Sequence, residues 1–208
     1  LELSVGGTTT GEIRSDADKN TIKKEGIKIE FWNQDKDIAI PFIARTEEGG
    51  LFGASANVGR FDLPNGNYTI IINENGYEDF TKNVTIENNE YLNLYNQIFL
   101  QPELVNATFE IKYRNATGSI VPLEGVTVNF EDKENDENNF NHITNLEGKI
   151  TLTNIMPKHY DMYIDEIMND GTDHFELSKQ DVNIRAGEKE QSFQRTIEWK
   201  VRVSGTIF

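Results

Sequence analysis

The 208-residue chain contains no cysteine. Without thiols it cannot form disulfides, zinc–thiolate sites or a cysteine nucleophile. Histidine is also scarce, and His142, His159 and His174 are far apart in sequence with no metal-ligand spacing. No motif marks a Ser–His–Asp arrangement. We therefore expect that this chain is not an enzyme.

Long apolar runs are missing as well. No stretch approaches the roughly 18 apolar residues that suggest a membrane-spanning helix, so we expect no membrane insertion in this segment. The hydrophobic content is 37% and the formal net charge is −15. Because so acidic a surface repels nucleic acids and anionic membranes, we expect no nucleic-acid partner. The charge favours cations and solubility instead.

Short segments of alternating apolar and polar residues are abundant. A period of two is typical of strands with one buried and one solvated face. The alternation is clear at Ile27, Ile29, Phe31, Val126, Val128 and Phe130. Turn sequences such as EEGG, LPNGN and NLEG separate these segments. With about seven such segments per hundred residues and no helical period, the pattern predicts an all-β fold of immunoglobulin-like, prealbumin-like sandwiches.

The alternating segments recur in one order at an offset of about 98 residues, which indicates a tandem repeat. The matching blocks are 24–35 with 123–134, 46–52 with 144–150, 63–72 with 156–164, and 83–90 with 181–188. We predict a first sandwich over residues 1–102 and a second over 103–203. Pro102 lies in the linker sequence QPELVN and has no N–H to donate to a preceding strand.

The final letters, VSGTIF, resemble the first strand of a repeat. Ile13 and Ile111 hold matching places in the two units, and Ile207 follows at a similar offset. We expect residues 204–208 to be the opening strand of a truncated third repeat. The alternative is that they complete the last strand of the second sandwich. The first residue is Leu1, and we expect the chain to be an excerpt or a processed piece.

The motifs carry a family resemblance. A Gly-Ile-Lys-Ile strand beginning at Gly26 is followed by Thr46-x-x-x-Gly50 and then by LPNGNY, which ends at Tyr68. This order resembles the carboxypeptidase regulatory-like, or transthyretin-like, sandwich and the B-type repeats of bacterial surface adhesins. The second unit departs from it with MPKHY, ending at Tyr160, which leaves the geometry of its turn open. The resemblance implies tandem extracellular modules that act as spacers, stalks or binding surfaces, without catalysis.

Some adhesin repeats of this kind form a Lys–Asn isopeptide bond assisted by a buried acid. In that family the acid lies four residues after the motif tyrosine. The corresponding residues are Ile72 and Ile164. Because an apolar side chain cannot catalyse the proton transfers, we expect no crosslink.

One acidic loop is a candidate calcium site. Asp16, Asp18 and Asn20 lie at alternate positions, and Glu25 follows. Calcium takes six to eight oxygen ligands, which loops with such spacing provide. The segment resembles a shortened Asp-rich calcium loop of some adhesin repeats, although a solvated polar loop is the alternative. A second acidic run, 131–139, has the same two interpretations, and no other cofactor is expected.

Two kinds of surface residue remain as candidates. Trp32 directly follows Phe31, so alternation places it on the outer face of the sheet. There it could bind sugars as a ligand platform, form an inter-domain contact or cover a sheet edge. Trp199 instead follows the same alternation as the core positions of its segment, so we expect it to belong to the core. Four N-glycosylation sequons begin at Asn67, Asn83, Asn106 and Asn115. They are permitted sites if the protein is secreted.

These observations predict a non-enzymatic structural or spacer module of a secreted or cell-surface microbial protein, in a surface layer or stalk. Its expected partners are neighbouring repeats of the same chain, other surface proteins and glycans. The alternatives are an adhesion or carbohydrate-binding module and an accessory domain of a larger secreted hydrolase.

Overall fold

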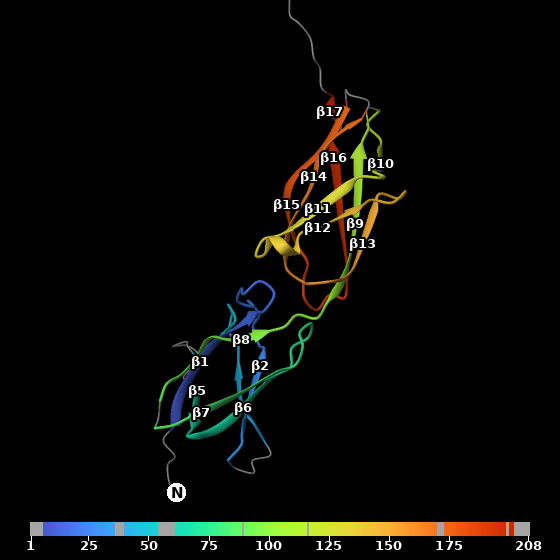
Figure 1. Ribbon diagram of the computed structural model, residues 1–208. Coiled ribbons are helices and arrows are strands. Elements are labelled where there is room, and N and C mark those ends of the chain that lie inside the picture. Colours follow the sequence, from blue (N-terminus) through green and yellow to red (C-terminus); the bar gives the residue numbers. More distant parts are fainter. Residues whose placement is uncertain are drawn as a thin grey trace, which may run out of the picture. The chain divides into compact units, whose positions relative to one another are not determined.

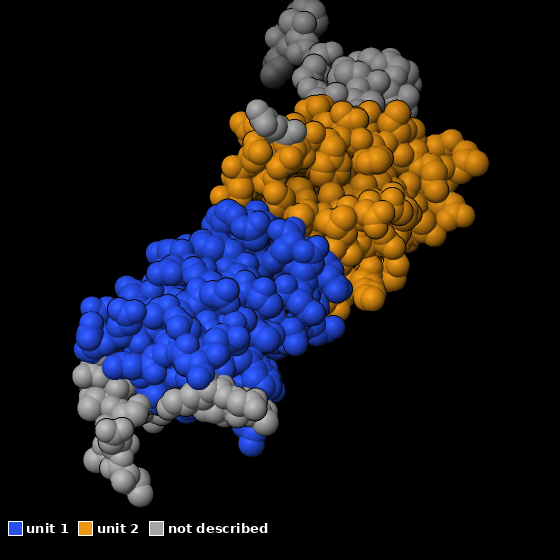
Figure 2. Space-filling model, turned by 60° about the horizontal axis from the view of Figure 1, so that its bottom comes forward, with its two compact units in different colours: residues 1–103 blue, residues 104–208 orange. Residues whose placement is uncertain are grey.

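The computed structural model describes residues 6–35, 40–53, 61–88, 90–115, 117–169, 173–198 and 200–201. The chain divides into two compact units, residues 1–103 and 104–208, which are coloured separately in Figure 2. The described residues are almost entirely strands and turns (Figure 1). Each unit contains two sheets around its own core, so the predicted all-β class of tandem immunoglobulin-like sandwiches is confirmed.

The first unit contains eight strands in its described part. They are β1 (Gly6–Ser15), β2 (Lys28–Asn33), β3 (Phe42–Arg45), β4 (Leu51–Phe52), β5 (Phe61–Pro64), β6 (Gly66–Ile72), β7 (Phe80–Ile86) and β8 (Leu92–Leu100). One sheet has the antiparallel order β3-β2-β6-β7. In the other sheet β1 pairs antiparallel with β4 and β5 and parallel with β8.

The second unit repeats this plan. Its elements are β9 (Val105–Arg114), β10 (Ile120–Pro122), β11 (Thr127–Asp132), the 3₁₀ turn η1 (Asp136–Asn138), β12 (Phe140–Ile143), β13 (Lys149–Ile155), β14 (His159–Asn169), β15 (Asp173–Asn183), β16 (Glu190–Glu198) and β17 (Lys200–Val201). One sheet has the order β12-β11-β14-β15-β17. In the other, β9 pairs antiparallel with β10 and β13 and parallel with β16.

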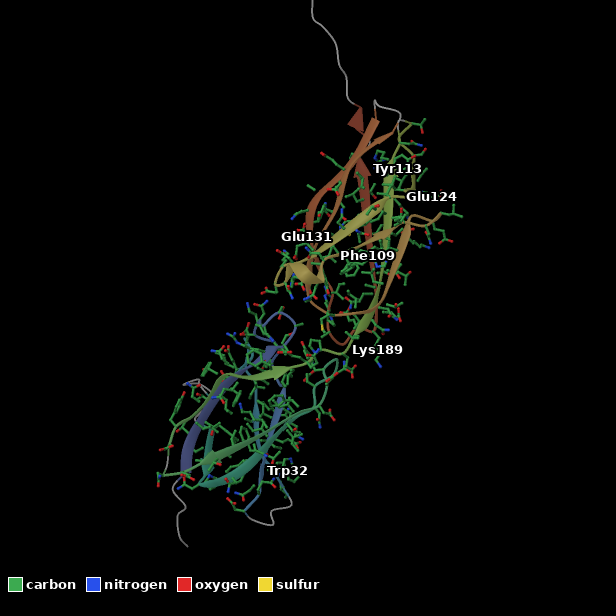
Figure 3. The ribbon with its side chains drawn as sticks, viewed as in Figure 1. Trp32, Phe109, Tyr113, Glu124, Glu131 and Lys189 are labelled. Atoms are coloured by element: carbon green, nitrogen blue, oxygen red, sulfur yellow. The ribbon has the colours of Figure 1, made fainter. Side chains whose placement is uncertain are left out.

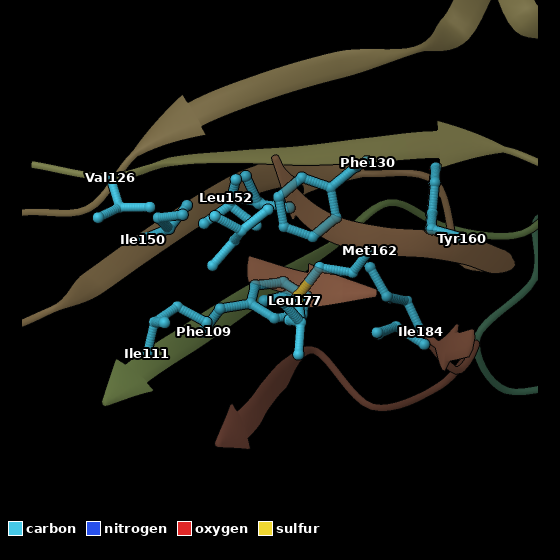
Figure 4. Packing of buried hydrophobic residues seen from close by; sticks show 14 of the residues in the cluster. Phe109, Ile111, Val126, Phe130, Ile150, Leu152, Tyr160, Met162, Leu177 and Ile184 are labelled. Atoms are coloured by element: carbon cyan, nitrogen blue, oxygen red, sulfur yellow. The ribbon is translucent and has the colours of Figure 1, made fainter. Parts of the chain in front are cut away.

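The alternating residues form the two cores, as the period of two predicts. Ile29, Phe31, Val128 and Phe130 are fully buried. In the second core, part of which is shown in Figure 4, the Phe109 ring meets the Phe130 ring edge-on with centroids 4.9 Å apart. Such aromatic pairs stabilise a core beyond the area that they bury.

The repeated glycines serve backbone geometry. Gly50 and Gly148 adopt φ angles of 79° and 70°, in the left-handed region that favours glycine. A Cβ on Gly148 would lie 2.4 Å from the carbonyl oxygen of Ile111, and one on Gly50 would lie 2.2 Å from that of Ile22. The glycine of the T-x-x-x-G motif is therefore required in both units, because the turn packs too closely against the neighbouring backbone to leave room for a Cβ atom.

Some predictions fall on residues that the structure does not describe. Residues 204–208, the predicted opening strand of a third repeat, lie outside the described residues. Trp199 lies outside them too, as does the side chain of His174. The truncated third repeat therefore stays a prediction.

Candidate functional site

The motif tyrosine makes the same contact in both units. Tyr68 donates its hydroxyl to the Pro64 carbonyl oxygen at 2.8 Å, and Tyr160 donates to the Met156 carbonyl oxygen at 3.1 Å. Both rings are buried, and burial raises the pKa of both phenols. The departure from the motif in MPKHY, which left the turn geometry open, therefore keeps the tyrosine contact.

The two units differ directly beside this tyrosine. Asn33 pairs with Tyr68 across the first sheet, and Asp132 pairs with Tyr160 across the second, so Asn33 and Asp132 hold equivalent positions. Two residues before the tyrosine the first unit has Gly66 and the second has Lys158. The Lys158 ammonium contacts the Asp132 carboxylate, and the two side chains are 7% and 0% exposed. A buried ion pair thus replaces an asparagine and a glycine.

Hydrogen bonds complete the surroundings of Asp132. Its carboxylate also accepts from the Glu134 backbone N–H at 2.9 Å and from Asn138 Nδ2 at 3.0 Å. Burial acts to raise the pKa of Asp132, but the hydrogen bonds from Lys158, Glu134 and Asn138 outweigh it and hold the pKa below its usual value. Asp132 is therefore ionised at neutral pH, and it anchors the acidic run 131–139 to the sandwich.

The sequence contained a signal for this pair. The repeat alignment already places Asn33 opposite Asp132, and the motif position of Gly66 becomes Lys158. Two polar changes of opposite charge at motif positions indicate a compensating ion pair. Sequence reasoning missed it because it considered the acidic run only as a loop that binds calcium or stays solvated.

A second charged cluster lies on the outer face of the β11–β14–β15 sheet. Lys133 Nζ lies 2.9 Å from Asp161 Oδ1 and 2.8 Å from Asp181 Oδ1, and His159 Nδ1 lies 3.0 Å from Asp181 Oδ2. The hydrogen bond that Lys133 donates to Asp181 is the largest cause both of the lowered pKa of Asp181 and of the raised pKa of Lys133. Because these groups are solvent-exposed, the cluster contributes little stability.

The predicted calcium ligands lie only partly together. Asp16 and Asp18 share the turn after β1, where Asp16 forms an ion pair with Lys19 and Asp18 Oδ1 accepts from the Asn20 N–H at 3.0 Å. Glu25 lies in a separate, exposed turn before β2. Among the described residues no group of three or more His, Asp or Glu side chains is placed to hold a metal ion. The calcium site stays a prediction.

Trp32, which is labelled in Figure 3, follows the buried Phe31 in β2 and therefore lies on the outer face of its sheet. Its indole Nε1 donates to Glu30 Oε2 at 2.8 Å, which holds the half-buried ring against the strand. Ile43 pairs with Glu30 on the neighbouring strand and is 43% exposed, so it shares this face.

A polar hollow of about 430 Å³ lies beside the motif turn of the first unit. Its lining includes Asp35, Asn67, Thr85 and Glu87. The Asp35 carboxylate accepts from the Asn67 backbone N–H at 2.6 Å and from Asn67 Nδ2 at 2.9 Å. The hollow therefore presents carboxylate, amide and hydroxyl groups, the types of group that hydrogen-bond sugar hydroxyls.

The four sequon asparagines all make hydrogen bonds within the fold. The Asn67 and Asn106 amides donate to Asp35 and Glu190, at 2.9 and 2.7 Å. Asn83 Oδ1 accepts from a threonine hydroxyl, and Asn115 Oδ1 accepts from two backbone N–H groups of its own turn. Modification at these positions stays a prediction.

The geometry defines a class of protein, tandem immunoglobulin-like sandwich modules. A family model described as the PEGA domain matches residues 49–101, less than half of the chain, in the first unit. No curated protein matched the chain. Within the described residues, no helix is long and apolar enough to cross a membrane.

Several solved structures are similar. The TIE protein of Bacillus anthracis shares 18% identity at a TM-score of 0.43, and the match covers 94% of this chain and 34% of that one. The chain thus spans about a third of the length of that protein. A minor pilin of Streptococcus agalactiae shares 14% identity at a TM-score of 0.37, with 97% of this chain and 98% of that one covered. A major pilin subunit of Bacillus cereus shares 7% identity at a TM-score of 0.33, with 92% and 99% covered.

Proposed function

We propose that this chain is a non-enzymatic spacer module of a secreted or cell-surface protein, as in a surface layer or stalk. One observation carries the proposal: a sandwich of the same plan occurs twice in series. The two copies share the parallel pairing of their first and last long strands, the tyrosine contact and a left-handed glycine in the T-x-x-x-G motif. A chain that repeats one small domain gains length and spacing from each copy. We also assign both sandwiches to the carboxypeptidase regulatory-like class.

The roles of the notable polar side chains support this proposal. Asp132 and Lys158 neutralise each other in the interior, and the hydroxyl of Tyr160 binds a backbone carbonyl. Asp16 is paired with Lys19. These groups are used to hold turns and strands in place, which is what a structural module requires.

Replacement of the module in the full-length protein tests the proposal. In the host organism, the segment is exchanged for an unrelated β-sandwich pair of equal length, and the surface display of the rest of the protein is measured by protease accessibility on intact cells. A spacer role predicts that display survives the exchange but is reduced when the segment is deleted. If the exchange abolishes the protein's activity while display is normal, the segment carries a specific function of its own.

A second candidate function is adhesion or carbohydrate binding by the first unit. The observation that favours it is the outer face with Trp32 and Ile43, together with the polar hollow lined by Asp35 and Asn67. Aromatic rings bind the apolar faces of sugars, while amides and carboxylates bind the hydroxyls.

A fluorescence titration tests this candidate. The chain has only two tryptophans, so Trp199→Phe leaves Trp32 as the single reporter. Glycans that bind the Trp32 face change its emission, and Trp32→Ala removes their retention on a glycan array. Binding that survives Trp32→Ala excludes this face.

A further inference from the structure

In each unit the first strand and the last long strand are parallel neighbours. In the second unit β9 and β16 pair without a register shift from Asn106 opposite Glu190 to Arg114 opposite Glu198 (Figure 1). In the first unit β1 and β8 pair in parallel from Thr9 opposite Leu92 to Ser15 opposite Leu100, with one irregularity. The first strand and the last long strand of each unit are thus joined directly by a hydrogen-bonded ladder.

This topology determines how a pull along the chain acts on the fold. The chain enters the second unit at the start of β9. It leaves β16 at its end and continues into the two-residue strand β17, which pairs with β15 of the other sheet. Because the two strands are parallel, these points lie at opposite ends of their common ladder. Tension between them slides the strands along each other, so the evenly spaced ladder bonds are loaded together. In an antiparallel pair both points would lie at one end, and the bonds would open one after another.

We propose that each sandwich is a load-bearing module in which the parallel pair of the first strand and the last long strand resists tension by shear. The proposal rests on the proposed spacer role for its use in the cell, because only a tethered chain comes under tension. The mechanical property itself belongs to the isolated chain and is measured there. A failure of one proposal is therefore distinguishable from a failure of the other.

Side-chain and backbone contacts reinforce the β9–β16 pair along its length. At the start, the Asn106 N–H donates to the Lys189 carbonyl oxygen at 2.9 Å. In the middle, the Phe109 and Phe193 rings stack with centroids 4.9 Å apart. Figure 3 shows Lys189 beside the beginning of β9 and Phe109 further along it. The core side chains of both strands must therefore move when the ladder shears.

The chain of the first unit is also secured after β8. The Gln101 carbonyl oxygen accepts from the Glu78 N–H at 2.8 Å, and the Glu103 N–H donates to the Gly76 carbonyl oxygen at 2.9 Å. Pro102 lies between these bonds, in a bridge with Tyr77. Tension that leaves β8 therefore meets a second attachment before it reaches the next unit.

The absence of cysteine allows a direct test in the full chain. Two double variants share Leu104→Cys as one attachment point. With Glu198→Cys as the second point, a pull loads the β9–β16 pair in shear. With Glu190→Cys as the second point, a pull peels the pair from one end. Leu104 is 50% exposed, and both glutamates are exposed. The variants are attached by their thiols in an optical trap, and the lifetime of the folded second unit is measured at constant force.

At equal force we expect the shear variant to survive more than about tenfold longer than the peeling variant. The reason is that one ladder hydrogen bond of about 1 kcal/mol corresponds to about a fivefold change in rate, and shear breaks several bonds in one step. The increase in extended chain length identifies the unit that unfolds. It corresponds to about 94 residues for the shear variant and about 86 for the peeling variant, at about 3.5 Å per residue. Equal melting temperatures of the two variants and the parent show that the fold is unchanged. Equal lifetimes overturn the proposal.

Discussion

Thr144 joins two turns of the second unit through one buried hydroxyl. Its Oγ1 donates to the Leu123 carbonyl oxygen at 2.6 Å and accepts from the Val126 N–H at 3.0 Å. Thr46 makes the same two bonds in the first unit, at 2.6 and 2.9 Å, with backbone groups of the turn before β2. Both threonines are 3% exposed. The first letter of the T-x-x-x-G motif therefore satisfies a buried donor and a buried acceptor.

We expect Thr144→Val to reduce the free energy of unfolding of the second unit by about 1–3 kcal/mol. The substitution keeps the shape of the side chain but leaves the Val126 N–H and the Leu123 carbonyl oxygen without their partner. Thr144→Ser keeps the hydroxyl and serves as the matched control, with a smaller loss. Urea unfolding measures both. A valine variant as stable as the serine variant contradicts this role of the hydroxyl.

Lys158→Met should cost about 3–5 kcal/mol, because it leaves the buried Asp132 carboxylate without its counter-charge. The first unit shows which residues could replace the ion pair and restore the lost stability. The double variant Asp132→Asn with Lys158→Gly copies Asn33 and Gly66 of the first unit, and we expect it to recover more than half of that loss. Chemical unfolding of the three proteins provides the comparison. A double variant no more stable than Lys158→Met would show that the asparagine and glycine of the first unit cannot replace the ion pair of the second.

The lowered pKa of Asp132 predicts an acid-dependent stability. The unfolded state binds a proton at about pH 4, and the folded state binds it only at lower pH. The stabilisation is therefore complete above about pH 4 and is lost as the pH falls from there through the folded pKa. The difference in unfolding free energy between the parent and Asp132→Asn, measured at a series of pH values, should shrink below pH 4. A difference that stays constant contradicts the prediction.

The two units should fold independently, because each has its own core. Residues 1–103 and 104–208, expressed separately, are expected to give cooperative thermal transitions that correspond to those of the whole chain. Near-ultraviolet circular dichroism reports the packing of the aromatic core in each fragment. If neither fragment folds alone, the two-domain organisation is wrong.

The calcium hypothesis has a simple test. If Asp16, Asp18, Asn20 and Glu25 bind calcium, millimolar calcium raises the melting temperature by mass action, and Asp18→Ala removes the rise. Lys19→Ala, which frees Asp16 from its ion pair, should then strengthen the response. A melting temperature that is the same in calcium and in chelator contradicts the calcium site and leaves these residues only their ion pair and turn contacts.

Sequence patterns predicted the buried faces of the strands well because burial of one face produces a period of two. Ile29, Phe31, Val128 and Phe130 are buried, and Trp32 lies on the outer face, as alternation predicts. Patterns of this kind contain no information on which polar residues meet across the fold. Lys158 and Asp132 are 26 residues apart, and their contact depends on the β11–β14 register.

The pairing of first and last strands also lies beyond local patterns. A strand's sequence shows that it is half-buried, but its neighbour is determined by the packing of the whole sandwich. The parallel β9–β16 ladder is therefore known only from the structure. The same is true of the ion pair between Asp16 and Lys19, which changes the interpretation of the acidic loop.

The buried ion pair should disfavour the exchange of strands between the two repeats during folding. Tandem domains of similar sequence are prone to misassembly, in which a strand of one copy enters the sheet of the other. A hybrid that placed β2 against β14 would bury Lys158 beside Asn33, with no charge to neutralise it, and a hybrid of β11 with β6 would bury Asp132 in the same way. Each such exchange would leave one uncompensated buried charge, at a cost of about 3–5 kcal/mol. The two charged residues that distinguish the second unit thus favour the pairing of each strand with its own copy.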